Sequence, residues 1–299
     1  MHLGASQSVA SGAGHAVVSP AGAIATVGGA QAVQASASLS VPQGPRFARR
    51  DWVTASRFLP LSDREVLAQV LQQITTVERP VVVLDLDSTL YQVEPRNYQI
   101  LQEWVNENRE GQFAAYAQAL SVLRPDQVGY TVQDNFTAVG INGSQGFHRV
   151  AMESLKQFWG KRFFSNEYLP FDRPYAGAPE FVQKLHSLGV QIIYLTGRDD
   201  SRMRAGTELN FIRDGFPWGS PSTYLWTKPV YNTPDLAHKR AAAERAKDLG
   251  TVVASFENEP ANLVALKQIL PEAMHVFVDT ICSDAVASPA EGVFRIQAF

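Results

Sequence analysis

Short apolar runs alternate with amphipathic segments along most of this chain. The run at residues 81–84 is too short for a helix and rich in β-branched residues, so it predicts a buried parallel strand. Further strands are predicted at residues 190–195, 224–226, 252–256 and 275–278, with an edge strand at 293–296. Helical spacing predicts helices at residues 66–74, 178–188, 204–213, 233–250 and 260–270. This alternation predicts an α/β, Rossmann-like fold, a parallel sheet sandwiched between helices.

Residues 91–175 interrupt the alternation. Apolar positions there keep helical spacing, as at Leu101, Trp104 and Val105, and no strand is indicated. We therefore expect a helical insertion at 91–175 that splits a core made of residues 46–90 and 176–299.

The first 45 residues contain no Asp, Glu, Lys or Arg and are rich in Ala, Gly and Ser. They lack the basic start and compact apolar run of a signal peptide. We interpret residues 1–45 as a disordered tail and expect a cytoplasmic protein.

Composition excludes several classes of protein. The single cysteine excludes a disulfide within the chain and a cysteine zinc cluster. No apolar stretch reaches the length of a membrane span. The net charge of −3 gives no general basic face, which disfavours a nucleic-acid partner. The oligomeric state is not indicated.

Polar residues follow the predicted strands, at the edge where open α/β sheets bind ligands. Asp85 and Asp87 follow the first strand, where a tight turn would let one carboxylate and a backbone carbonyl share a metal ion. A solvated acidic turn, the DxD site of nucleotide-sugar transferases and a Walker-B-like strand end are the alternatives. Thr196 and Gly197 follow the second strand and suit a phosphoryl oxygen, because glycine permits close backbone approach.

Two lysines and a second acidic strand end complete the candidates. Lys239 lies on a predicted helix, and Lys228 after a short strand competes with it. Glu257 and Asn258 follow a further strand, and Asn262 comes four residues after Asn258. Oxygen ligands there suit Mg²⁺, and an acidic helix cap is the alternative.

The sequence resembles the haloacid dehalogenase-like superfamily of hydrolases. The resemblance lies in four motifs that occur in this order: a strand followed by DLDST, a strand followed by TGR, a lysine on a helix, and a strand followed by ENExxN. It is most similar to the Mg²⁺-dependent phosphatase branch. The resemblance extends from about residue 81 to the C-terminus and does not include the first 50 residues.

The resemblance implies a role for each matching residue. Asp85 would be the nucleophile that forms an aspartyl-phosphate, and Asp87 the general acid and base. Thr196 and Gly197 would bind the phosphoryl group, and Lys239 would neutralise its charge. It implies a phosphomonoester hydrolase acting on a small phosphorylated substrate. A non-catalytic phosphate- or protein-binding relative and a phosphotransferase remain as alternatives.

The implied Mg²⁺ ligands are the Asp85 carboxylate, the Asp87 carbonyl and a side chain of the fourth motif. That motif departs from the commoner acidic pair, since it reads Glu257-Asn258. Phosphatases of the RNA-polymerase tail have a similar Asp-Asn pair in which Asn binds the metal. We therefore favour Asn258 as the ligand and keep Glu257 as the alternative.

The insertion would be a cap that closes over the site and selects the substrate. Its stretch at 159–164 combines aromatic and basic residues; the basic ones are expected at the surface, and contact with an acidic substrate is the alternative. Tyr91 is placed at the entrance of the site. Arg198 is expected to form a salt-bridge group at a helix start with Asp199 and Asp200.

Overall fold

The computed structural model describes residues 46–47, 49–143 and 146–299. The tail predicted at residues 1–45 lies outside the described residues. No helix in the described ranges has the length and apolar character needed to cross a membrane.

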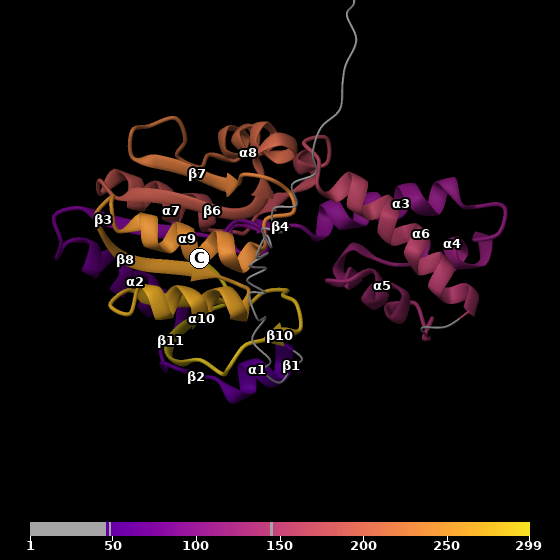
Figure 1. Ribbon diagram of the computed structural model, residues 1–299, viewed down its shortest axis with the longest axis horizontal. Helices are drawn as coiled ribbons and strands as arrows, with labels where there is room; N and C mark the ends of the chain where they lie inside the picture. The colour runs from indigo at the N-terminus through magenta and orange to yellow at the C-terminus, as the bar shows by residue number, and fades with distance from the viewer. Residues whose placement is uncertain (1–45, 48, 144–145) are drawn as a thin grey trace, which may run out of the picture. The chain divides into compact units, whose positions relative to one another are not determined.

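A seven-stranded sheet forms the centre of the core, and every neighbouring pair in it is parallel (Figure 1). Its strands, in spatial order, are β2 (Arg57–Phe58), β11 (Glu291–Ile296), β9 (Met274–Val278), β8 (Thr251–Glu257), β3 (Pro80–Leu84), β6 (Gln191–Asp199) and β7 (Thr223–Lys228). The predicted parallel sheet is confirmed. The edge position predicted for residues 293–296 is wrong, because β2 pairs outside β11. A two-residue strand such as β2 has no readable period.

Helices cover both faces of the sheet and divide the side chains of β3 between two apolar clusters. Val82 and Leu84 pack with one helix layer, and Val81 and Val83 with the other, because successive side chains of a strand point to opposite faces. The first layer consists of α2 (Asp63–Ile74), α7 (Ala178–Ser187) and α8 (Asp200–Asp214); the second consists of α9 (Asp235–Ala246) and α10 (Pro260–Ile269). The fully buried β3 agrees with its unbroken apolar run.

The chain leaves the core after β4 (Tyr91–Gln92) and returns at β5 (Arg173–Pro174), and these two strands pair antiparallel. No strand was expected here; two-residue pairing leaves no trace in the hydrophobic pattern. Between them lie α3 (Glu94–Glu107), α4 (Ala114–Leu120), η1 (Pro125–Gln127), α5 (Val132–Ala138), α6 (Gly146–Phe163) and η2 (Leu169–Phe171). These helices build their own apolar cluster, which includes Trp104, Phe136 and Leu155.

A small peripheral unit flanks the sheet. The short β1 (Arg46–Phe47) pairs antiparallel with β10 (Ala285–Val286), and α1 (Arg49–Ala55) follows β1. The Trp52 ring of α1 is fully buried and lies 5.0 Å from the ring of Phe277 in β9. This contact joins the start of the described chain to the sheet.

Candidate active site

The ends of β3, β6 and β8 and the start of α9 surround one pocket of about 490 Å³. The pocket is lined by six of the seven predicted site residues: Asp85, Asp87, Gly197, Lys239, Glu257 and Asn258. Thr196 is fully buried and does not line the pocket; its Oγ1 accepts the N–H of Arg198 at 3.2 Å. The parallel strands explain this meeting, since their carboxyl ends share one edge of the sheet.

A tight turn follows Asp85. The N–H groups of Thr89, Leu90 and Tyr91 all donate to the carbonyl of Leu86, at 2.9 to 3.1 Å. Ser88 adopts a φ of 60°, which costs a non-glycine residue of the order of 1 kcal/mol. The turn keeps Asp85 and Asp87 at the strand end instead of extending the strand.

Lys239 lies between two buried carboxylates. Its Nζ donates to Oδ1 of Asp85 and, at 2.6 Å, to Oε2 of Glu257. Burial and the nearby Glu257 carboxylate raise the pKa of Asp85 to about 8, although Lys239 acts in the opposite direction. When both carboxylates are ionised, one lysine leaves one negative charge without a counter-charge. The site then takes up either a proton, as the raised pKa of Asp85 indicates, or an additional cation.

Asn258 offers an oxygen beside Asp85. The Thr89 hydroxyl lies 2.9 Å from Oδ2 of Asp85 and 3.1 Å from Oδ1 of Asn258, and its one proton serves one of them at a time. Donation from Nδ2 of Asn258 to the carbonyl of Ile281, at 2.8 Å, sets the orientation of the amide. Both oxygens of Glu257 already have donors, namely Lys239 and the N–H of Glu259.

These oxygens fit a hard cation such as Mg²⁺. In the described part of the chain, no group of three His, Cys, Asp or Glu side chains could hold a metal ion. A cation here would therefore be bound by the Asp85 carboxylate together with amide and backbone oxygens.

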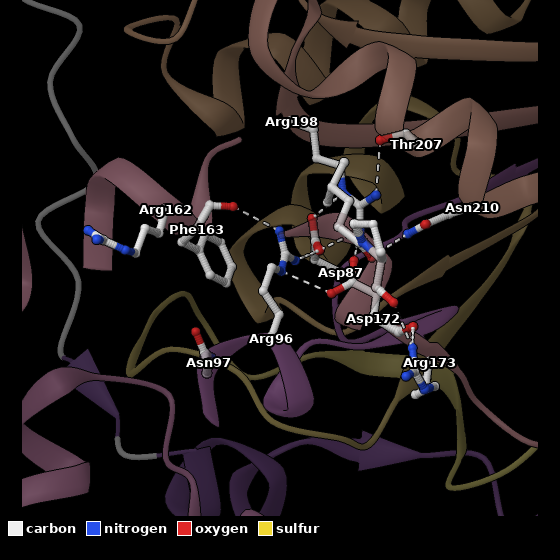
Figure 2. A network of polar contacts seen from close by, with 12 residues as sticks. Asp87, Arg96, Asn97, Arg162, Phe163, Asp172, Arg173, Arg198, Thr207 and Asn210 are labelled. Carbon is white, nitrogen blue, oxygen red and sulfur yellow. Dashed lines mark hydrogen bonds and ion pairs between the residues drawn. The ribbon is translucent and has the colours of Figure 1, made fainter. Parts of the chain in front are cut away.

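Asp87 is clamped by two arginines (Figure 2). Arg198 donates to Oδ2 of Asp87 at 2.9 Å and to Oδ1 at 2.8 Å, and Arg96 of α3 donates to Oδ1 at 2.5 Å. Both arginines also pair with the buried Asp172, at 2.9 Å each. Burial would raise the pKa of Asp87, but Arg198 and Arg96 outweigh it and hold that pKa far below its usual range.

The predicted salt-bridge group of Arg198 with Asp199 and Asp200 is wrong. Asp199 caps α8 and pairs with Arg202, and Asp200 pairs with Arg204, whereas Arg198 turns to Asp87. Arg96 and Asp172 were not predicted as site residues. The sequence showed them only as two charged residues within the insertion. They come together with Asp87 and Arg198 only in the folded structure.

Comparison with known proteins agrees with this arrangement. The family model described as haloacid dehalogenase-like hydrolase matches residues 80–269, which is more than half of the chain. The chain belongs to the haloacid dehalogenase-like hydrolases. A search among curated proteins finds no match.

Solved structures similar to this haloacid dehalogenase-like hydrolase have low sequence identity to it. Protein Tyrosine Kinase A of Mycobacterium tuberculosis is 13% identical, with a TM-score of 0.46, covering 75% of this chain and 94% of its own. A HAD-superfamily hydrolase of subfamily IA from Geobacter sulfurreducens is 15% identical, with a TM-score of 0.42, covering 74% and 92%.

Two expectations for this haloacid dehalogenase-like hydrolase need correction or completion. Tyr91 does not lie at the entrance; it is fully buried, 5.2 Å from the ring of Phe216. The aromatic residues at 159–164 line the pocket, as Trp159, Phe163 and Phe164. The basic Arg162 turns away from the clamp around Asp87 and pairs with Glu103 (Figure 2).

Gly197 of this haloacid dehalogenase-like hydrolase approaches α9 closely. A Cβ on Gly197 would lie 2.5 Å from Oδ1 of Asp235, whose other oxygen accepts from Asn262. We expect Gly197→Ala to lower the free energy of unfolding by about 1–3 kcal/mol and to impair turnover by displacing this turn. Urea unfolding and steady-state kinetics measure both.

Gly160→Ala is the matched control. Gly160 lies within α6, and a Cβ there would meet nothing within 4 Å. Alanine should stabilise this helix by about 0.5–1 kcal/mol. Equal effects of the two substitutions would contradict a special role for the close approach at Gly197.

Proposed function

We propose that this hydrolase cleaves small phosphomonoesters with Mg²⁺ through an aspartyl-phosphate on Asp85. The observation that carries the proposal is the meeting of Asp85, Lys239 and Asn258 around one pocket. A carboxylate nucleophile, a fixed cation and oxygen ligands for a metal are the groups that phosphoryl transfer needs. A protein that only binds phosphate would not need a nucleophile such as Asp85 or a general acid and base such as Asp87.

In the first step, an oxygen of Asp85 attacks phosphorus while the ester P–O bond breaks. The departing oxygen takes a proton from Asp87. In the second step, water attacks the phosphoryl group, Asp87 takes its proton, and the Asp85–phosphorus bond breaks. The clamp of Arg96 and Arg198 holds Asp87 ionised, ready to accept a proton. To donate in the first step, Asp87 must first leave a guanidinium and take up a proton from solvent.

Other residues of the chain would stabilise the transferring group. Lys239 would neutralise charge on Asp85 and the phosphoryl oxygens, and the turn at Thr196 and Gly197 would supply backbone N–H donors. Mg²⁺, held by Asp85, the Asp87 carbonyl and Asn258, would supply further neutralisation of the phosphoryl charge. We assign Asn258 rather than Glu257 as the ligand because both oxygens of Glu257 have donors.

We also propose that the insertion at 91–175 acts as a cap on a core made of 46–90 and 176–299. Asn97 of α3 and Trp159 of α6 line the same pocket as Asp85. Side chains from the insertion therefore lie where the leaving group of a phosphomonoester would be. Such a position suits water exclusion and substrate selection.

Hydrolysis of p-nitrophenyl phosphate with Mg²⁺ and with EDTA tests the proposal. We expect activity with Mg²⁺, loss to background with EDTA, and recovery when Mg²⁺ is restored. Phosphate release equal to p-nitrophenol release, with alcohols present, distinguishes hydrolysis from phosphotransfer. If no activity is found, Mg²⁺ with beryllofluoride should still raise the melting temperature; failure of both results contradicts the proposal.

A further inference from the structure

Lys228 is a largely buried side chain of the pocket that the proposed reaction does not use. It is the last residue of β7, lines the same pocket as Asp85, and is only 9% exposed. Among the described residues, no hydrogen bond or ion pair reaches its Nζ; the Tyr231 ring lies 5.8 Å away. A lysine that lines a pocket and forms no ion pair with a described carboxylate is placed to bind an anionic group of a ligand.

Most carboxylates around the pocket are bound to other groups. Asp87 binds two arginines, Glu257 binds Lys239, and Glu259 accepts from Ser283 at 2.5 Å. Across the strand pair, Asp199 stands opposite Lys228 and is bound to Arg202. Asp235 accepts from Asn262 through one oxygen, and its other oxygen lies beside Gly197. Among the described residues no carboxylate forms an ion pair with Lys228, and Asp235, whose Oδ1 has no hydrogen-bond partner, lines the same pocket without a cationic partner.

An aromatic wall lies next to Lys228. Trp159 and Phe163 stack with ring centroids 4.5 Å apart, Phe164 packs on Phe163 at 5.0 Å, and Tyr231 meets Phe164 at 5.2 Å. Tyr231 is the ring nearest Lys228, so the wall extends toward that lysine. The wall suits a planar or apolar leaving group.

We propose that Lys228 binds a second anionic group, a carboxylate or a second phosphate, on a substrate whose body lies against this aromatic wall. The proposal rests on the proposed function and adds the substrate class to it. The transferring phosphoryl group would lie at Asp85 and Lys239, and the second anion at Lys228. Lys239 and Lys228, which were competing candidates for one role in the sequence, would then bind two different anions: the transferring phosphoryl group and the second anionic group.

Three aryl phosphates test the assignment: phenyl phosphate, 4-carboxyphenyl phosphate and benzene-1,4-diyl bisphosphate. We expect the wild type to prefer the two doubly anionic compounds by about tenfold to a hundredfold in kcat/KM, the effect of one charge-assisted hydrogen bond. Lys228→Met should remove this preference and leave phenyl phosphate within about twofold. Lys228→Arg should retain part of the preference. The exposed Lys161→Met, on α6, controls for the loss of a positive charge.

Equilibrium binding separates failure of this assignment from failure of the proposed function. Calorimetric affinities for phenylphosphonate and 4-phosphonobenzoate need no turnover. Tighter binding of 4-phosphonobenzoate, lost in Lys228→Met, supports the assignment even if no ester is hydrolysed. Equal affinities in the wild type, or a loss in Lys228→Met of equal size for both compounds, would overturn it. The melting temperature of each variant verifies folding.

Discussion

Replacing Asp85 with Asn is expected to lower turnover by about 10⁴-fold or more, because an amide cannot form the proposed phosphoryl-enzyme bond. The fold should be retained. Asn has the shape of Asp, its oxygen can keep the Thr89 hydrogen bond, and Lys239 with Glu257 remains as one balanced ion pair. Phosphate release at saturating Mg²⁺ measures the first effect, and thermal unfolding the second.

The matched control is Asp126→Asn, at an exposed aspartate of the insertion. It should leave both turnover and stability near those of the wild type. Activity above about a tenth of the wild type in Asp85→Asn would exclude Asp85 as the nucleophile. Loss of folding would instead show that the carboxylate is needed structurally.

Lys239→Met is expected to have the largest effect on stability. It leaves Asp85 and Glu257 buried without their shared cation, and breaking such a buried pair costs about 3–5 kcal/mol. Urea unfolding measures the loss against Lys247→Met, where an exposed lysine leaves an exposed Glu244. Turnover should also fall, since the transferring phosphoryl group loses its fixed cation.

The pH dependence of this loss follows from the direction of the pKa shifts. Burial raises the pKa of Asp85 and that of Glu257, and Lys239 opposes both. Without the lysine, both folded-state pKa values rise further, so the folded variant binds protons more tightly than the unfolded chain. Its stability deficit should therefore shrink toward acid pH and grow as pH rises through the folded-state pKa values. Because the pKa of Asp85 is already about 8 in the wild type, a deficit that does not grow as pH rises above about 8 would contradict the assignment of uncompensated carboxylates.

Much of the fold was predictable because it depends on local patterns. The unbroken apolar run at β3, for example, is recognised from a few neighbouring residues. The helix boundaries were less accurate. α8 begins at Asp200, four residues before the start expected from apolar spacing, because its polar first turn lacks that spacing.

The contacts of the site were predictable only in part. Asp85 and Asn258 follow strands of one parallel sheet, so their meeting follows from topology. The pairing of Asp87 with Arg96 does not, because Arg96 belongs to a helix of the insertion. That contact depends on which side of α3 carries Arg96, and on Asp172, which pairs with Arg96 where the chain re-enters the core.

The sequence by itself determined the sheet, its helices and the polar residues at the strand ends. It could do so because strand periodicity is local, and because the residue after a parallel strand lies at the ligand-binding edge whatever its distant neighbours are. Only the tertiary structure decided which lysine is paired. Lys239 reaches Asp85 and Glu257 because α9 packs against β6 and α10 with its first turns at the carboxyl edge of the sheet. Lys228 lines the same pocket, and no described carboxylate forms an ion pair with it. Such choices depend on side chains far apart in the chain, whose distances no local pattern contains.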